Sequence, residues 1–194
     1  MRFVISGLAV ALAVASPAAA QMSDSYTFLK GVRDKDGAKV TELLNRPGTV
    51  VVDTRDSATG ESALHIVTKR RDTQWLAFLL QKGARPDTRD ANGNTPLLLA
   101  AQLGWTDGVS LLLDRRATPD LANGLGETPL LWAVQNRDLA TVKRLLMAGA
   151  DPKRTDSGSG LSVREHAARD PRAGAILREL DAAAPKKKPA VGPN

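Results

Sequence analysis

The side chains that could support acid–base or metal chemistry are few in this 194-residue sequence. It contains two histidines, His65 and His166, and no cysteine. Without cysteine there is no thiolate nucleophile, no thiolate zinc site and no disulfide bond. Neither histidine belongs to a His-x-x-x-His pattern, the spacing that places two imidazoles on one helix face for zinc. The sequence therefore predicts no metal site at these residues.

Carboxylates are more plentiful, but their positions indicate turns. Aspartate in a turn accepts hydrogen bonds from its own backbone about two residues further on, whereas acid–base catalysis needs carboxylates gathered around a substrate. These aspartates recur at the period of a sequence repeat, as do Gly60, Gly93 and Gly126, so we interpret both sets as turn residues. We expect no catalytic and no cofactor-binding residue among them. The aspartates are Asp53, Asp56, Asp87, Asp90, Asp120, Asp151 and Asp156.

One stretch of sequence is written twice in the middle of the chain. GNTPLLLAAQLGWTDGVSLLLDRRATPD begins at Gly93, and GETPLLWAVQNRDLATVKRLLMAGADPK begins at Gly126, 33 residues later. A period of this length is typical of solenoids, in which one unit cannot cover its own apolar face and neighbours must stack. The same period relates Gly60, Gly93 and Gly126, then Ser62, Thr95 and Thr128, then Leu64, Leu97 and Leu130, and finally Leu79, Leu112 and Leu145.

Each central unit has the signals of two short helices. Thr95 is placed to cap the first helix, Pro96 suits its first turn, and Gly104 ends it. A second helix follows and presents Val109, Leu112 and Leu113 on one side. It ends near Arg116, at the position where the sister units have Gly83 and Gly149, which predicts a left-handed residue after the helix.

Four segments carry a family resemblance: Gly60 to His65 (GESALH), Gly93 to Leu97 (GNTPL), Gly126 to Leu130 (GETPL) and Gly149 to Asp151 (GAD). They are similar to the ankyrin repeat, with its G-x-T-P-L-H opening and G-A-D ending. The resemblance covers about residues 25–180 and implies an all-α solenoid of helix-turn-helix units with short β-turn or hairpin fingers. About five units are expected, at about 25–56, 57–92, 93–125, 126–158 and 159–180, the outer two being degenerate caps.

The last unit departs from the pattern in a way that suits an end cap. Arg164 replaces the first-helix leucine, and a buried arginine between neighbouring units would be costly. We therefore expect it on the outer, solvent-facing side. Asp170 and Pro171 are expected to open the final helix, which buries Ile176, Leu177 and Leu180. At the other end, residues 21–24 are expected to lead into the first helix.

The aromatic and imidazole side chains have mainly structural interpretations. Trp132 matches first-helix core positions, so we expect it in the core. Trp75 and Trp105 lie around the second helix and are expected to be partly exposed, as weak candidates for binding anchors. The resemblance places His65 at the helix-opening position, where it would bond neighbouring turns. His166 is expected to face the preceding unit or solvent.

The two ends of the chain have a different composition from the repeats. Residues 1–20 combine Arg2, an apolar run and the small-residue end Ala18 to Ala20, which is typical of a secretory signal peptide cleaved after Ala20. An uncleaved membrane anchor is the alternative. Residues 181–194 form a Lys-, Pro- and Ala-rich tail that we expect to be disordered. The absence of cysteine favours a bacterial periplasm, or alternatively the extracellular medium.

The net charge of +6 is not evidence for nucleic-acid binding. Much of the surplus comes from Arg2 in the signal and from three lysines in the tail, and the repeat body is only weakly basic. The resemblance implies instead a non-catalytic protein-interaction module without a cofactor or metal. Two alternatives stay open: an envelope structural protein whose Lys tail contacts an anionic membrane or polyanion, and, more remotely, an enzyme.

In the ankyrin pattern, the varied residues lie at the finger tips and on the inward side of the first helices. We expect the basic members of this set (Arg55, Lys69, Arg70, Arg71 and Arg89) to form a patch that meets an acidic protein surface. The full set of candidate protein-binding residues is Arg55, Glu61, Lys69, Arg70, Arg71, Arg89, Asn92, Asn94, Gln102, Leu103, Leu125, Glu127, Gln135 and Asn136.

Overall fold

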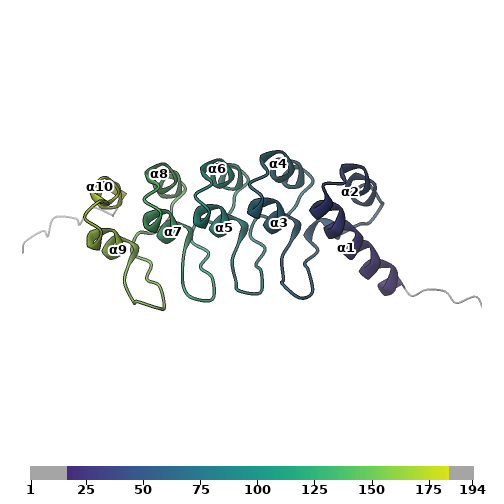
Figure 1. Cartoon of the computed structure of the whole chain (residues 1–194), viewed down its shortest axis with the longest axis horizontal. Coiled ribbons are helices and arrows are strands. Elements are labelled where there is room, and N and C mark those ends of the chain that lie inside the picture. Colours follow the sequence, from purple (N-terminus) through teal and green to yellow (C-terminus); the bar gives the residue numbers. More distant parts are fainter. Residues whose placement is uncertain (1–16, 184–194) are drawn as a thin grey trace, which may run out of the picture.

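The computed structural model describes residues 17–183, with side chains from Asp24 onward. In these residues ten α-helices form five consecutive pairs that lie side by side in one row (Figure 1). The expected signal peptide, apart from residues 17–20, and nearly all of the expected tail lie outside them. The pairs are α1 (Pro17–Asp34) with α2 (Gly37–Leu44), α3 (Ala63–Lys69) with α4 (Thr73–Gln81), α5 (Pro96–Gln102) with α6 (Thr106–Asp114), α7 (Pro129–Gln135) with α8 (Leu139–Met147), and α9 (Val163–Arg169) with α10 (Gly174–Ala183).

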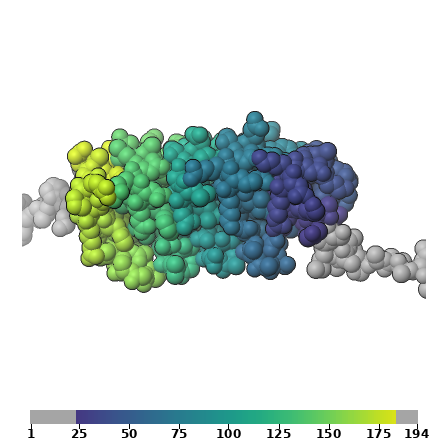
Figure 2. Space-filling model, viewed as in Figure 1, coloured from purple at the N-terminus to yellow at the C-terminus, as the bar shows by residue number. Residues whose placement is uncertain are grey.

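The row has two helical layers and a fringe of loops. Figure 1 shows the second helices of the pairs along the top, the first helices beneath them, and long loops that hang below. One turn of 3₁₀-helix, Val51–Asp53, lies in the first of these loops. Side chains fill the row into one elongated body, as Figure 2 shows. The predicted all-α solenoid is therefore confirmed.

The helix signals read from the sequence act as expected in the central units. The hydroxyl of Thr95 accepts the Leu98 N–H at 3.2 Å, and the following proline occupies the first turn of α5. Thr128 caps α7 in the same way, at 3.2 Å from the Leu131 nitrogen. Gly83, Arg116 and Gly149 all have left-handed φ, at 89°, 63° and 94°. These repeated caps and turns begin and end the helices at equivalent positions in the central units.

The core is continuous along the row because equivalent leucines are buried in every central unit. Leu79, Leu112 and Leu145 of the second helices are all 0% exposed. Their first-helix partners at 64, 97 and 130 are buried as well. Packing between units therefore contributes to the burial of these leucines, as expected for a solenoid whose units stack on one another.

The tryptophans differ from one another in burial, and one expectation about them is wrong. Trp105 is only 7% exposed, so it is not a surface anchor. It replaces the capping aspartate found before α4 and α8, and its ring covers Gly108, where a β-carbon would meet the ring at 2.1 Å. Glycine at 108 thus makes room for the indole. Trp75 is half-buried, and Trp132 is half-buried against the core.

The C-terminal cap forms with one correction. Asp170 and Pro171 do not open the last helix, because Asp170 ends α9 and accepts the Arg172 N–H at 3.0 Å in a turn. The helix α10 begins four residues after Asp170, at Gly174, and buries Ile176 and Leu180 as expected. Leu177 is half-buried. Arg164 is exposed and bonds Asp181 at 2.5 Å on the outer side of the cap.

At the N-terminal end, α1 is longer than the sequence pattern indicates. Residues 21–24 were expected to precede the first helix, but they lie within α1, which begins at Pro17. The expected cleavage point after Ala20 therefore falls inside this helix. Figure 1 shows α1 running obliquely across the end of the row. The oblique first helix gives the N-terminal unit a shape that differs from the units behind it.

Candidate functional site

The loops below the helices are hairpin-like fingers joined at their tips. Each finger closes on itself, for example through the Asp56 N–H and the Glu61 carbonyl at 2.8 Å. Backbone hydrogen bonds then link successive tips: Ala91 N–H to Thr59 O at 2.9 Å, Gly124 N–H to Asn92 O at 3.0 Å, and Ser157 N–H to Leu125 O at 2.9 Å. The tips therefore form a fixed row of surface positions rather than independent loops.

Glycine is required where neighbouring fingers approach each other. Gly60, Gly93 and Gly126 have φ of 69°, 81° and 75°, a region that costs other residues about 1–2 kcal/mol. A β-carbon on Gly60 would also lie 2.7 Å from the Ala91 nitrogen of the next finger, and one on Gly93 would lie 3.0 Å from the Gly124 nitrogen. These glycines thus set the spacing of the fingers.

A second ladder links the bases of the fingers through carboxylates. Asp53 accepts the Arg85 backbone N–H at 2.8 Å, Asp87 accepts that of Thr118 at 2.9 Å, and Asp120 accepts that of Asp151 at 3.0 Å. The expectation that these three aspartates bond their own turns is wrong, because each one reaches into the following unit. Their recurrence reflects the repeated contact between units.

We expect Asp87→Ala to lower the free energy of unfolding by about 1–2 kcal/mol. The change removes the acceptor of the Thr118 N–H and of the Thr118 hydroxyl, which bonds Asp87 at 2.6 Å, and each such bond contributes about 0.5–1.5 kcal/mol. Urea unfolding followed by circular dichroism measures the loss. Asp114→Ala is the control, since it breaks only an exposed ion pair with Arg144 and should cost well under 1 kcal/mol. Equal losses would contradict the ladder.

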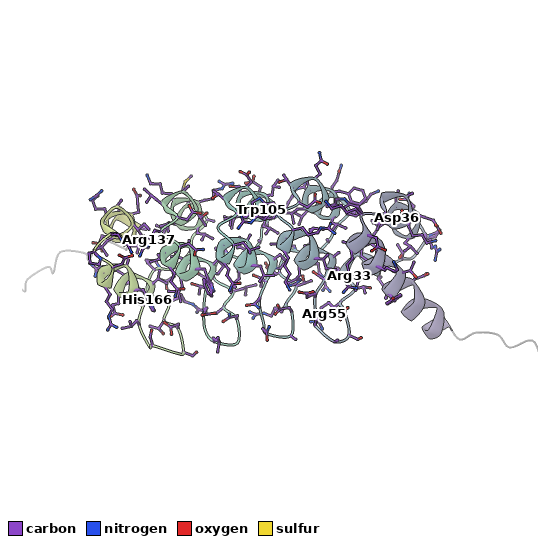
Figure 3. All side chains as sticks on the ribbon, in the orientation of Figure 1. Arg33, Asp36, Arg55, Trp105, Arg137 and His166 are labelled. Atoms are coloured by element: carbon purple, nitrogen blue, oxygen red, sulfur yellow. The ribbon has the colours of Figure 1, made fainter. Side chains whose placement is uncertain are left out.

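The other turn aspartates behave as the sequence predicts. Asp56 accepts the N–H groups of Ala58 and Thr59 at 3.0 and 3.1 Å, within its own turn. Arg33 of α1 also bonds it at 2.6 Å, and Figure 3 shows Arg33 above the finger that carries Arg55. The Arg33 guanidinium and these turn N–H groups lower the pKa of Asp56 to about 2. Asp90, Asp151 and Asp156 also bond backbone N–H groups of their own turns.

Asn123 is an anchor that the sequence interpretation missed. It takes the finger position of Asp56, Asp90 and Asp156, and its side-chain oxygen accepts the N–H groups of Leu125 and Glu127, both at 3.0 Å. Its amide nitrogen donates to the Glu127 carboxylate at 2.7 Å and to the Asn94 side chain at 3.1 Å. The repeat register, which aligns an amide with three carboxylates, could have indicated this role.

The arginines of the expected basic patch are used mainly to connect units. Arg55 donates to the Arg89 carbonyl at 3.1 Å, and Arg89 donates to the carbonyls of Gly93 and Ala122 at 3.1 and 2.6 Å. A guanidinium spans such gaps well because it has five donors in a rigid fork. These two side chains therefore link successive fingers.

The remaining basic residues of the patch are also engaged. Arg70 is largely buried and donates to the Val32 carbonyl of α1 at 2.6 Å. Arg71 donates to the Leu103 carbonyl of the next unit, and Lys69 pairs with Glu61. Reversing the charge of Arg70 or Arg89 would thus disturb the fold before it tested a partner.

The candidate residues separate into two groups. Asn94, Asn136 and Glu127 bond other residues of the solenoid; the Asn136 amide, for instance, donates to the Ala101 carbonyl at 3.0 Å. A second group makes no side-chain hydrogen bond or ion pair with any described residue. Its members are Asn92, Gln102, Leu103, Leu125 and Gln135, and Leu125 is 64% exposed.

The repeat architecture agrees with a comparison against protein families. The family model described as Ankyrin repeats (3 copies) matches residues 32–123 and, in a second overlapping match, residues 64–156. Together these ranges cover more than half of the chain. The chain belongs to the ankyrin-repeat family. Ankyrin repeats generally mediate protein–protein interaction, and the family is typically non-catalytic.

His65 sits at the helix-opening position of its ankyrin repeat and is fully buried. Its Nδ1 accepts the Ser62 N–H at 3.1 Å, so the proton is on Nε2, which donates to the Asn94 carbonyl at 2.9 Å. Burial lowers the pKa of His65. The imidazole is therefore held neutral between two ankyrin units, with both nitrogens engaged.

A serine, a histidine and an aspartate meet in the last finger of the ankyrin domain. His166 Nε2 lies 2.7 Å from Asp156 and 3.1 Å from the Ser159 hydroxyl, and that hydroxyl lies 2.6 Å from the same carboxylate. In a Ser-His-Asp relay the serine and the aspartate bond different nitrogens of the imidazole. Here both bond Nε2, so the geometry closes a turn and does not activate the serine. The Ser159 and His166 bonds lower the pKa of Asp156.

The described residues contain neither a cluster of metal ligands nor a membrane-spanning helix. No group of three or more His, Cys, Asp or Glu side chains between residues 24 and 183 is placed to hold a metal ion. No helix in the part of the chain that the structure describes is long and apolar enough to span a bilayer.

Proposed function

We propose that this protein is an exported, non-catalytic binding module that holds a partner protein against its finger tips and the inward side of its first helices. The observation that carries the proposal is the contrast within the candidate set. The charged candidates are committed to contacts within the solenoid, whereas Asn92, Leu125, Gln102 and Gln135 leave their side chains unengaged by any described residue.

These four residues occupy only two positions of the repeat. Asn92 and Leu125 are 33 residues apart in neighbouring fingers, and Gln102 and Gln135 are 33 apart at the ends of α5 and α7. A rigid row of equivalent, unengaged positions can bind without first ordering itself, which limits the entropic cost of association. The partner chemistry this supports is a neutral polar surface with an apolar contact for Leu125. The acidic surface expected from the basic patch has less support, because the arginines are engaged.

Affinity capture with paired variants tests this surface. The tagged chain 21–194 is used to capture proteins from a periplasmic extract, beside a variant carrying Leu125→Ser, Gln102→Ala and Gln135→Ala. We expect a captured protein to lose about tenfold or more in affinity for the variant, as for truncation of central interface residues. Met147→Ser is the matched control, because Met147 is 80% exposed on α8. Equal capture by all three chains would refute the proposed surface.

Export is a separate part of the proposal, supported by the signal pattern of residues 1–20. Cell fractionation, followed by mass spectrometry of the purified protein, would show where the protein is located and at which residue the mature chain begins. We expect a mature chain that begins at Gln21 and is recovered in the periplasmic fraction. A chain that retains residues 1–20 and is recovered with membranes would support the uncleaved anchor instead.

A further inference from the structure

The outer layer of second helices contains one break in its packing. The helix α4 packs on α6, α6 on α8, and α8 on α10, but α2 does not pack closely on α4. A groove of about 320 Å³ lies between them, lined by Lys35, Gly37, Thr41, Gln74, Trp75 and Phe78. The volume is at the low end for a ligand pocket, which suits one or two inserted side chains.

Two aromatic side chains form the floor of this groove, and the equivalent positions of α6 and α8 are not aromatic. Trp75 and Phe78 are both half-buried and form an edge-to-face pair, with ring centroids 5.8 Å apart and an interplanar angle of 80°. The same two helix positions hold Gly108 and Leu111 in α6, and Thr141 and Arg144 in α8. Half-exposed aromatic side chains lining a groove are the residue types that dominate interface energetics. The groove is thus a local feature and not a consequence of the repeat.

One lysine lines the groove and a second lies over its aromatic floor. Lys35 is 59% exposed and pairs with Asp72, the cap of α4, at 3.1 Å. Lys82 follows the last residue of α4; its ammonium lies 5.8 Å from the centre of the Phe78 ring and pairs with no carboxylate among the described residues. Two cations therefore stand beside the apolar floor, Lys35 near the first residue of α4 and Lys82 over the Phe78 ring.

We propose that this groove binds a short, acidic, amphipathic helix of another protein. Apolar side chains at positions i and i+4 would contact Trp75 and Phe78, and carboxylates at the two ends of the helix would meet Lys35 and Lys82. The chain's own tail is a poor occupant by charge, because Lys186, Lys187 and Lys188 would face lysines. This surface lies on the outer helix layer and does not depend on the proposed function of the fingers.

The test uses labelled synthetic helical peptides of 14 residues with chain 21–194, measured by fluorescence anisotropy. The acidic peptide has leucines at i and i+4 and glutamates at both ends; one matched peptide replaces the glutamates with lysine, and another replaces the leucines with serine. We expect the acidic peptide to bind about tenfold or more tightly than either matched peptide. Raising the salt concentration should weaken the difference between the acidic and basic peptides.

Two variants locate the binding site. The double variant Trp75→Thr with Phe78→Leu introduces the residue types found at the equivalent positions of the other units, Thr141 of α8 and Leu111 of α6. It should weaken binding of the acidic peptide about tenfold or more. Lys82→Glu changes only an exposed side chain and should weaken it severalfold, without a change in unfolding midpoint; Met147→Ser should change nothing. Undetectable binding at about 1 mM peptide, equal binding of acidic and basic peptides, or dimerisation of the chain that requires Trp75 would each overturn the proposal.

Discussion

Gly60→Ala is expected to lower the free energy of unfolding by at least about 2 kcal/mol. The alanine would have to hold a φ of 69°, which costs about 1–2 kcal/mol. Its β-carbon would also be 2.7 Å from the Ala91 nitrogen, so the next finger would have to move away and the Ala91 to Thr59 hydrogen bond would lengthen. Denaturant unfolding measured by circular dichroism gives the loss.

Gly104→Ala is the matched control for this prediction. Gly104 has a nearly identical φ of 62°, but a β-carbon there meets nothing within 4 Å. The loss of unfolding free energy in Gly104→Ala should therefore reflect only the backbone strain. The difference between the two variants therefore measures the contact between fingers, and equal losses would show that the fingers do not constrain each other.

His65→Ala is expected to cost about 3 kcal/mol, because it leaves a cavity and deprives the buried Ser62 N–H of its acceptor. His65→Leu should cost less, since the next two units accommodate Leu98 and Leu131 at this position. The same denaturant titration measures both variants. A loss below about 1 kcal/mol for His65→Ala would contradict a structural role for the imidazole.

The stability contribution of His65 should also depend on pH. Burial is the largest influence and lowers its pKa below the ordinary 6.5. The unfolded chain then takes up a proton at a higher pH than the folded chain, so the contribution is complete above about pH 6.5 and is lost as pH falls toward the lower, folded pKa. We expect the stability difference between the native chain and His65→Leu to shrink over that interval. A difference that stays constant would contradict a buried, neutral imidazole.

The sequence was sufficient to predict the repeat units because local signals and the period agree. Thr95, Pro96 and the leucines at 97, 112 and 145 act within one unit or at equivalent positions, so a comparison of units identifies them. The ends of the helices in the terminal cap units were harder to predict. Asp170 and Pro171 are a plausible helix start, but the chain uses the aspartate to close a turn after α9, and the choice depends on how the last helix packs.

The roles of the charged residues could not be predicted, because they depend on contacts about 33 residues away. Arg55 and Arg89 have the composition of a binding patch, and only the structure shows that their guanidinium groups bond backbone carbonyls of neighbouring fingers. Asp53 is likewise bonded to the next unit. Trp105 was misassigned for the same reason, since its burial depends on the absence of a side chain at Gly108.

The contacts between finger tips explain how the side chains on this surface can vary while the fold is retained. The finger-tip hydrogen bonds between Ala91 and Thr59, and between Gly124 and Asn92, use only backbone atoms. Side chains such as Leu125 can therefore change without loss of finger spacing. Substitutions at the tips should alter partner choice more than stability, whereas substitutions at the finger glycines should do the reverse.

Backbone amide hydrogen exchange, with and without the captured partner, tests the central claim most directly. The claim is that the fingers and first helices form the binding surface. It predicts slower exchange on binding in residues 91–94 and 124–127 and at the C-terminal ends of α5 and α7, with the outer helix α8 unchanged. Protection confined to residues 184–194 would contradict it and would favour the tail as the binding element.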